Sequence, residues 1–161
     1  MDTNDDLLLE LLNSSPVING APTDALTGGA GNTFADQFGG TGTTAETVNL
    51  RQMRDILQRL IRGADATREL NAALESAALT PEATPQGLRW NLRTDPDRQL
   101  ATRAATAWSR ILEEHPGRLR ACANEECNLF LFDRSRPGTA KWCSMATCGN
   151  RMKARTFAQR H

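Results

Sequence analysis

The sequence predicts a mainly α-helical protein that ends in a small α+β module built on four cysteines. Only eight of the 161 residues are aromatic, so the core must be built largely from Leu and Ala, which favour helices. All four cysteines fall between positions 122 and 148, in a paired pattern. We therefore expect a helical domain over residues 1–117, with a small strand element, and a cysteine module over residues 118–161.

The first fifty residues combine a short helix with a polar, glycine-rich stretch. Residues 5–12, DDLLLELL, predict a helix with two aspartates at its positive end. Residues 13–44 offer few apolar groups to offset the entropy of ordering, so we interpret them as loop or partly disordered, with a Gly/Thr-rich loop or linker over residues 27–44. Phe34 and Phe38 are expected to form one short docking turn. The segment GGAGNT lacks the lysine of a phosphate-binding loop, which disfavours that interpretation.

Two helices are predicted next, packed as an antiparallel pair. Thr43 and Glu46 form a capping box at the start of a helix over residues 46–62. Asp65 can cap a second helix over residues 66–78. Three basic residues of the first helix lie largely off its apolar face and are expected to be solvated: Arg51, Arg54 and Arg62.

A strand and a third long helix complete the helical domain. The segment GLRWNLR, residues 87–93, alternates apolar and polar residues and predicts a half-buried strand, whose partner lies around Leu79 or in residues 118–121. Asp95, followed by a proline, is a strong start signal for a helix over residues 96–114. The predicted buried stripe of this helix comprises Leu100, Ala104, Trp108, Ile111 and Leu112.

The four cysteines occur as two C-x4-C pairs separated by 15 residues. A tetrahedral zinc site takes two thiolates from each of two tight turns, which is what this pattern supplies. The predicted ligands are Cys122, Cys127, Cys143 and Cys148. Four protein thiolates leave no open position, so we expect one structural Zn²⁺. Disulfides and unrelated free thiols are the alternatives. The N-terminus has no secretory signal pattern, so we expect a cytoplasmic protein in which paired cysteines bind metal.

The remainder of the module is expected to contain a hairpin and a final helix. Residues 129–132 are an apolar strand and residues 134–138 form turns, so the spacer between the cysteine pairs predicts a hairpin. Gly149 is expected to permit a left-handed turn beside the last cysteine. A helix over residues 150–160 should dock through an apolar stripe of Ala154, Phe157 and Ala158.

Charge is distributed unevenly, although the formal net charge is zero. Residues 1–50 carry a net charge of −7, residues 51–118 of +2 and residues 119–161 of +5. A mildly basic module permits contact with nucleic acid without requiring it. The candidate contacts are Arg134, Arg136, Lys141, Arg151, Lys153, Arg155 and Arg160. The alternative for each residue is an exposed charge that keeps the module soluble. For Arg151 a further alternative is that it buttresses the zinc loop or pairs with Asp133. Trp142 is expected to pack over the metal site.

Several motifs lie close together in RLRACANEECNLFLFDRSRPGTAKWCSMATCGNRMKAR: R-x-C-x4-C, D-x-S and WCSMxxCGNRxKxR. In these motifs the chain resembles the CGNR zinc finger family, named after the tetrapeptide at residues 148–151. Family members usually carry an N-terminal helical ABATE domain, described as a stress-induced transcription regulator. LLLELLNSSPVINGAPTDAL resembles its opening and LRQMRDILQRLI its central helix. Because residues 27–44 replace further helical sequence, this domain is expected to be shortened.

The resemblance implies a bacterial-type, zinc-binding transcription regulator whose finger contacts nucleic acid, with DNA favoured over RNA. One alternative is a protein–protein interaction module with a purely structural zinc, and another is ligand sensing by the helical domain. An enzyme is not expected, because the predicted zinc is saturated and the histidines, His115 and His161, form no nucleophile–base pair. No apolar run is long enough to cross a membrane.

Overall fold

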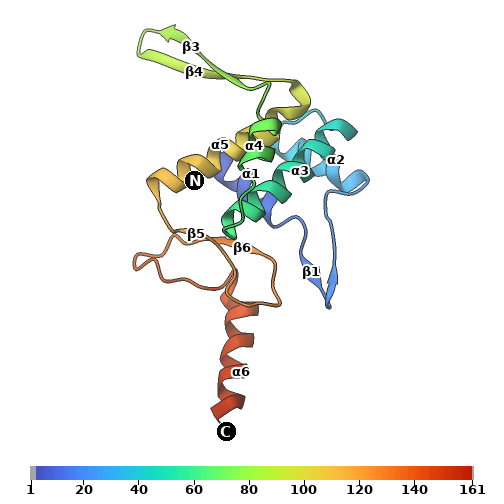
Figure 1. Ribbon diagram of the computed structural model, residues 1–161, viewed down its shortest axis with the longest axis vertical. Helices are drawn as coiled ribbons and strands as arrows, with labels where there is room; N and C mark the ends of the chain where they lie inside the picture. The colour runs from blue at the N-terminus through green and yellow to red at the C-terminus, as the bar shows by residue number, and fades with distance from the viewer. Residues whose placement is uncertain (1–2, 161) are drawn as a thin grey trace.

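Three helices lie at the centre of the computed structural model, which describes residues 3–160 (Figure 1). Helices α1 (Thr3–Leu12), α3 (Thr44–Ile61) and α5 (Gln99–Glu114) pack against one another. Their facing side chains form the buried core, which includes Leu7, Leu8, Leu11, Leu50, Met53, Leu57, Leu100, Ala104 and Ile111. The mainly α prediction is confirmed. Within the described residues, no helix is both long and apolar enough to cross a membrane.

The predicted capping box at the start of α3 is present in a slightly altered form. The Thr43 hydroxyl accepts a hydrogen bond from the Glu46 amide, at 3.1 Å. The Glu46 carboxylate accepts in return from the amide of Gly42 at 2.8 Å, one residue earlier than the usual partner. The cap therefore fixes both the first turn of α3 and the chain that leads into it.

Helix α5 starts where it was predicted to start. Its predicted buried stripe is also found, except at Leu112. Asp95 accepts a hydrogen bond from the Asp97 amide at 2.9 Å and opens a 3₁₀ turn, η1 (Pro96–Arg98), that leads into α5. Trp108 is half-buried against the core. Leu112, however, is 44% exposed, because it lies near the end of the helix and outside its packed face.

Residues 29–38 form a helix, so the prediction of a loop over residues 27–44 is wrong there. Helix α2 (Gly29–Phe38) buries Ala35 and Phe38, and the rings of Phe34 and Phe38 lie 5.2 Å apart. The helix ends at Gly39, whose φ of 74° is left-handed. The glycines at the ends of α2 thus bound the helix, while its apolar residues supply the contacts that stabilise it.

A short helix, α4 (Thr67–Ala73), packs against α3 and is shorter than the predicted 66–78. The Asp65 carboxylate accepts a hydrogen bond from the Thr67 amide at 3.0 Å, as expected of a cap. Leu70 and Leu74 are only partly buried against the core. Beyond them the chain turns into a strand.

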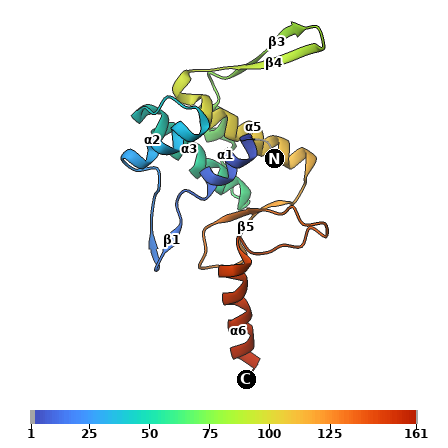
Figure 2. The same cartoon turned by 180° about the vertical axis from the view of Figure 1, so that it is seen from behind.

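Two hairpins extend from the helical body (Figures 1 and 2). The shorter pairs β1 (Val17–Ile18) with β2 (Ala21–Pro22), and the longer pairs β3 (Ala78–Thr84) with β4 (Gly87–Arg93). The predicted strand over residues 87–93 and its partner near Leu79 are therefore confirmed.

The longer hairpin is exposed, which corrects the prediction of a half-buried strand. Its register places Leu79 opposite Leu92, Pro81 opposite Trp90 and Ala83 opposite Leu88, so these six residues share one face. Leu79, Leu88 and Trp90 are 57%, 64% and 59% exposed. The alternation is real, but the hairpin projects beyond the helices that would cover it.

One arginine of α3 is buried, so the prediction of a solvated basic face fails at Arg54. Its guanidinium binds Asp24 at 2.8 Å, Asp55 at 2.9 Å and the Ser14 hydroxyl at 3.1 Å. Arg51, which is more exposed, also binds Asp24, at 3.0 Å. These contacts tie α3 to the chain that follows α1.

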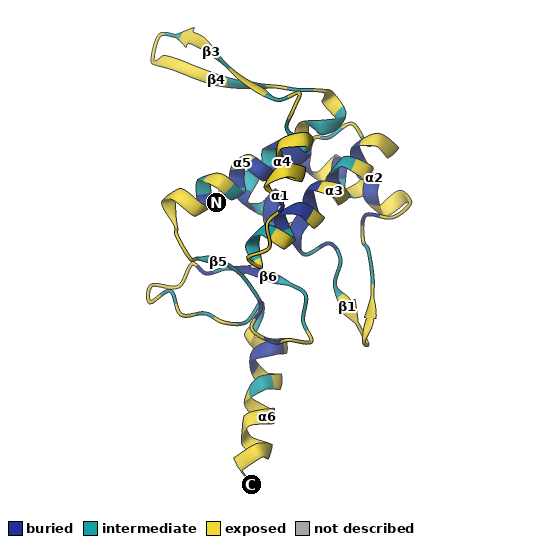
Figure 3. Ribbon diagram, viewed as in Figure 1, coloured by how far each residue is buried: buried dark blue, intermediate teal, exposed yellow. Residues whose placement is uncertain are grey.

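The C-terminal module contains a third hairpin and a projecting helix. Strand β5 (Leu119–Ala121) pairs with β6 (Phe130–Phe132), and a π-helical turn, η2 (Met145–Gly149), leads into α6 (Asn150–Arg160). The hairpin encloses the first cysteine pair, which corrects the prediction that it lies in the spacer. The final helix is confirmed, but its predicted docking stripe is wrong, because α6 extends away from the body and is largely exposed (Figure 3). Its three exposed stripe residues are Ala154, Phe157 and Ala158.

The module is joined to the helical body through β6. The Asn13 side chain donates to the Phe130 carbonyl at 3.1 Å and accepts from its amide at 2.8 Å, like a neighbouring strand. The Phe130 ring is buried, and the Arg62 guanidinium lies over it at 4.4 Å. Arg62 also donates to the Asn128 carbonyl at 3.0 Å. The module's β6 is thus part of the main core.

Candidate metal centre

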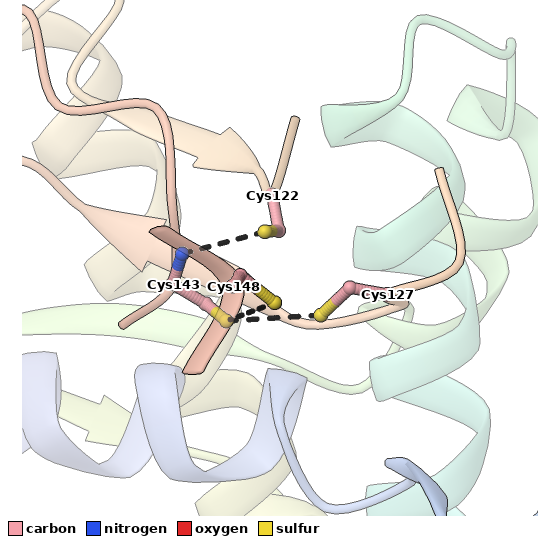
Figure 4. Close-up of side chains that lie close together, drawn as sticks. All are labelled: Cys122, Cys127, Cys143 and Cys148. Atoms are coloured by element: carbon pink, nitrogen blue, oxygen red, sulfur yellow. Dashed lines mark hydrogen bonds between the residues drawn. The ribbon is translucent and has the colours of Figure 1, made fainter. Parts of the chain in front are cut away.

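The four cysteines meet at the base of α6 (Figure 4). Their sulfur atoms all lie within 4.8 Å of one another, and Sγ of Cys143 lies 3.7 Å from Sγ of Cys127 and of Cys148. A tetrahedron with Zn–S bonds of about 2.3 Å has S–S edges of about 3.8 Å. All four thiols are free of disulfides. The donor set therefore fits one zinc ion held by Cys122, Cys127, Cys143 and Cys148.

Backbone hydrogen bonds place the two cysteine pairs side by side. The Cys122 amide donates to the Leu129 carbonyl at 2.8 Å, which continues the β5–β6 pairing into the first turn. The Cys127 amide donates to the carbonyl of Asn124 at 2.8 Å and closes that turn. The Ala123 amide donates to the Lys141 carbonyl at 2.9 Å, which brings the second pair beside the first.

Two N–H groups donate directly to the sulfurs. The Cys143 amide lies 3.4 Å from Sγ of Cys122, and the side-chain nitrogen of Asn124 lies 3.4 Å from Sγ of Cys148. Asn124 is almost completely buried. Such outer contacts orient thiolate ligands and offset their negative charge. The sequence pattern did not single out Asn124, because the only signal is a polar residue within the first cysteine turn.

The environment shifts the acidity of three thiols in two directions. Burial raises the pKa of Cys127, and burial together with the neighbouring thiols raises that of Cys143. Burial also opposes ionisation of Cys148, but hydrogen bonds from Asn124 and the other cysteines outweigh it and lower the pKa. A zinc ion, when bound, stabilises all four thiolates and releases their protons.

Gly149 lies in a tightly packed place, and the left-handed turn that the sequence suggested for it is wrong. Its φ is not positive, and it lies within η2. A Cβ atom at this position would lie 2.8 Å from Sδ of Met145 and 3.2 Å from Cδ1 of Trp142. Trp142 therefore packs closely against the chain beside Cys148.

A buried carboxylate organises the spacer between the cysteine pairs. Asp133 accepts hydrogen bonds from the Ser135 amide at 2.9 Å and hydroxyl at 2.6 Å, and from the Ala140 amide at 2.9 Å. The Arg120 guanidinium completes its shell at 2.5 Å. The pKa of the Asp133 carboxyl is lowered, chiefly by the hydrogen bonds from Ser135. Among the described residues the ion-pair partners of Asp133 are Arg118 and Arg120, and Arg151 lies exposed on α6, so the suggested pairing of Arg151 with Asp133 is wrong.

The motifs that carry this geometry identify the module. Residues 118–161 match the family described as CGNR zinc finger. The C-terminal module is a CGNR zinc finger. The resemblance drawn from its motifs is confirmed, and the clustered cysteines are the site of one structural zinc ion. The match does not extend to residues 1–117, where the resemblance to the ABATE domain stays a prediction. No match to the chain was found among curated proteins.

The basic residues of the CGNR zinc finger fall into separate groups. Arg134 and Arg136 lie in the spacer and line a cleft. Lys153 and Arg160 line a different groove, on α6. Arg155 binds Glu126 at 2.6 Å. The two remaining candidates, Arg151 and Lys141, are exposed, and neither has an ion-pair partner within residues 3–160.

The groove on α6 combines rings with cations. It measures about 420 Å³ and is lined by Trp142, Met152, Lys153, Thr156, Phe157 and Arg160. Trp142 thus packs against Gly149 and also faces this groove. His115 lies at the end of α5, as expected, with its ring 5.5 Å from that of Phe132. His161 lies outside the described residues.

Proposed function

We propose that this protein is a cytoplasmic, non-enzymatic transcription regulator whose zinc finger contacts nucleic acid through α6, with DNA favoured over RNA. One observation carries the proposal. Helix α6 projects from the molecule (Figure 1). It carries no acidic residue and four exposed cations: Arg151, Lys153, Arg155 and Arg160. Cations of this kind neutralise backbone phosphates and release counterions.

The shape of α6 favours double-stranded DNA. Its 11 residues make a rod about 16 Å long, and most of its surface is open to solvent. The major groove of B-DNA admits an α-helix, and arginines there read guanine edges. In this arrangement zinc sets the direction of α6, because Cys148 and η2 lead directly into its first turn.

The groove beside α6 favours a second kind of nucleic-acid target, a single strand. Trp142 and Phe157 line it together with Lys153 and Arg160. Aromatic rings flanked by cations bind unpaired bases by stacking and phosphates by charge. Single-stranded DNA or RNA would use this groove, whereas a duplex would use the cations of α6 alone.

Protein–protein interaction is the alternative function, with a purely structural zinc. The observation in its favour is the exposed apolar face of the β3–β4 hairpin, which includes Leu79, Leu88 and Trp90. Contiguous exposed apolar residues are typical of interaction surfaces.

Fluorescence anisotropy with the zinc-loaded full chain tests the proposal. Random-sequence duplex DNA, single-stranded DNA and RNA are titrated over a series of salt concentrations, with wild type and a Lys153→Ala/Arg160→Ala variant. The variant should bind more weakly, and the slope of log K against log salt should fall by about one per lost phosphate contact. Arg68→Ala, an exposed arginine of α4, is the matched control. Equal affinity of the double variant and wild type at low salt would remove α6 as the binding surface.

A further inference from the structure

A second cleft lies between the helical body and the zinc finger. The end of α5, the start of β5 and the spacer that follows β6 form its walls, with α1 at one side. Its lining includes Asp5, His115, Arg118, Phe132, Arg134 and Arg136. The volume of about 540 Å³ is in the range of small-molecule sites and much larger than a single inorganic ion requires.

The cleft has uncompensated positive charge. Both carboxylates in its wall already have cationic partners. Asp5 pairs with Arg110, which also binds Glu114, and Asp133 pairs with Arg120 and lies 4.0 Å from Arg118. Within residues 3–160, no acidic group forms an ion pair with Arg134 or Arg136. The field inside the cleft is therefore suited to an anion.

Contacts with the wall hold two of the cationic side chains in place. The Arg134 guanidinium lies over the Phe132 ring, 4.9 Å from its centroid. Nη1 of Arg118 donates to the carbonyls of Asp133 and Ser135. Cations that are already ordered lose less entropy when a ligand binds, so the cleft is partly prepared for its anion.

We infer that this cleft binds a phosphate ester. Guanidinium groups match phosphate oxygens in pairs, and the three arginines that line the cleft, Arg118, Arg134 and Arg136, offer more donors than the two oxygens of a carboxylate can accept. Phe132 and His115 give the organic part of the ester a ring surface to contact. The inference goes beyond nucleic-acid contact by α6, since such a ligand would bridge the end of α5 and the spacer of the finger.

NMR titration of the ¹⁵N-labelled, zinc-loaded full chain with phenyl phosphate tests this site. We expect saturable shifts of the amide signals of His115 and residues 132–136. Inorganic phosphate should bind more weakly because it lacks the ring, and phenol should cause no shift there because it lacks the charge. No saturable shift at these residues would overturn the inference.

The variant Arg134→Ala/Arg136→Ala should weaken phenyl phosphate binding at least about tenfold, through the loss of charge-assisted hydrogen bonds. Both side chains are exposed and free of ion pairs in the described part of the chain, so zinc content and melting temperature should be unchanged. Arg68→Ala, an exposed arginine of α4 outside the cleft, should bind phenyl phosphate like wild type. Equal affinity of the double variant and wild type would also overturn the inference.

Competition then identifies the source of the phosphate. If an oligonucleotide displaces phenyl phosphate and Arg134→Ala/Arg136→Ala weakens both, the ester is that of a nucleic-acid backbone. If the oligonucleotide and phenyl phosphate bind together, the cleft takes a small phosphorylated molecule. Lys153→Ala/Arg160→Ala should affect the oligonucleotide alone, so the failure of either proposal is visible separately.

Discussion

The Arg120 guanidinium, two residues before the first cysteine, donates a hydrogen bond of 2.5 Å to the buried carboxylate of Asp133, just after β6. Asp133 also accepts from Ser135 and Ala140, so one carboxylate ties β5 to two positions within the spacer. This arrangement gives a physical reason for the R-x-C and D-x-S motifs. The residues of these motifs fix the segment that leads to Cys143 and so position the second cysteine pair.

Asp133→Asn should accelerate the transfer of zinc to a chelator. The substitution removes the charge that faces Arg120, whose buried Nε already has no hydrogen-bond partner among the described residues. Stopped-flow measurement with a chromogenic chelator gives the rate. Glu125→Gln, an exposed carboxylate between the first two cysteines, is the control and should transfer zinc at the wild-type rate. An unchanged rate in Asp133→Asn would show that the spacer does not support the site.

Asn124→Ala should lower zinc affinity by roughly 10–100-fold, the usual cost of removing an outer-shell donor. The buried Asn124 amide is the side-chain donor to Sγ of Cys148, at 3.4 Å. Competition with a chelator of known affinity measures the effect. Asn150→Ala serves for comparison, because the exposed Asn150 side chain donates to a helix carbonyl, that of Ala146, at 3.4 Å and to no sulfur among the described residues. Similar affinities of the two variants would contradict the assigned role.

Gly149→Ala should destabilise the finger by about 1–3 kcal/mol through overpacking. The added methyl group would approach Met145 and Trp142. Because the side chain of Met145 is flexible and 53% exposed, adding Met145→Ala should recover part of the loss. Chemical denaturation of the single and double variants measures both effects. If Met145→Ala gave no recovery, backbone conformation and not space would explain the glycine.

Asp24→Asn should destabilise the helical body by about 1–3 kcal/mol at pH 7, because the buried Arg54 loses a charged partner. Burial opposes ionisation of Asp24, but hydrogen bonds from Arg54 and the Leu26 amide outweigh it and lower the pKa. The ion pair therefore contributes fully above the ordinary pKa of about 3.9 and is lost as the pH falls through the lowered value.

Denaturation of wild type and Asp24→Asn at several pH values checks this linkage. The difference between their unfolding free energies should shrink below about pH 4. Asp36→Asn, at an exposed aspartate without an ion pair in the described part of the chain, is the control and should unfold with nearly the wild-type free energy at pH 7. A difference for Asp24→Asn that stayed constant down to pH 2 would contradict the assignment.

Local signals in the sequence located the helices and the metal site well. Thr43, Asp65 and Asp95 act on the backbone within a few residues, so their caps could be predicted without knowledge of the fold. Cysteine spacing likewise reports two tight turns, and the structure brings all four thiols together. Nucleic-acid contact by the basic residues stays a prediction, since the cations on α6 are suited to it without demonstrating it.

What sequence reasoning missed depends on tertiary contacts. Helix α2 was not predicted from composition, because the many glycines at its ends indicate a loop and only a few apolar residues, among them Ala35 and Phe38, indicate a packed helix. Arg54 was expected in solvent, since its partner Asp24 lies 30 residues away in the chain. The apolar pattern in β4 and in α6 indicated packing faces, but both elements project from the body. Periodicity predicts a face and cannot supply the element that would cover it.

Native mass spectrometry of the full chain and of Cys143→Ser tests whether four cysteines hold one zinc ion that organises residues 118–161. Wild type should carry one zinc per chain. Cys143→Ser should lose zinc, and residues 118–161 should gain hydrogen exchange while the core helices stay protected. Full zinc retention in Cys143→Ser, with an unchanged melting curve, would contradict the four-cysteine site.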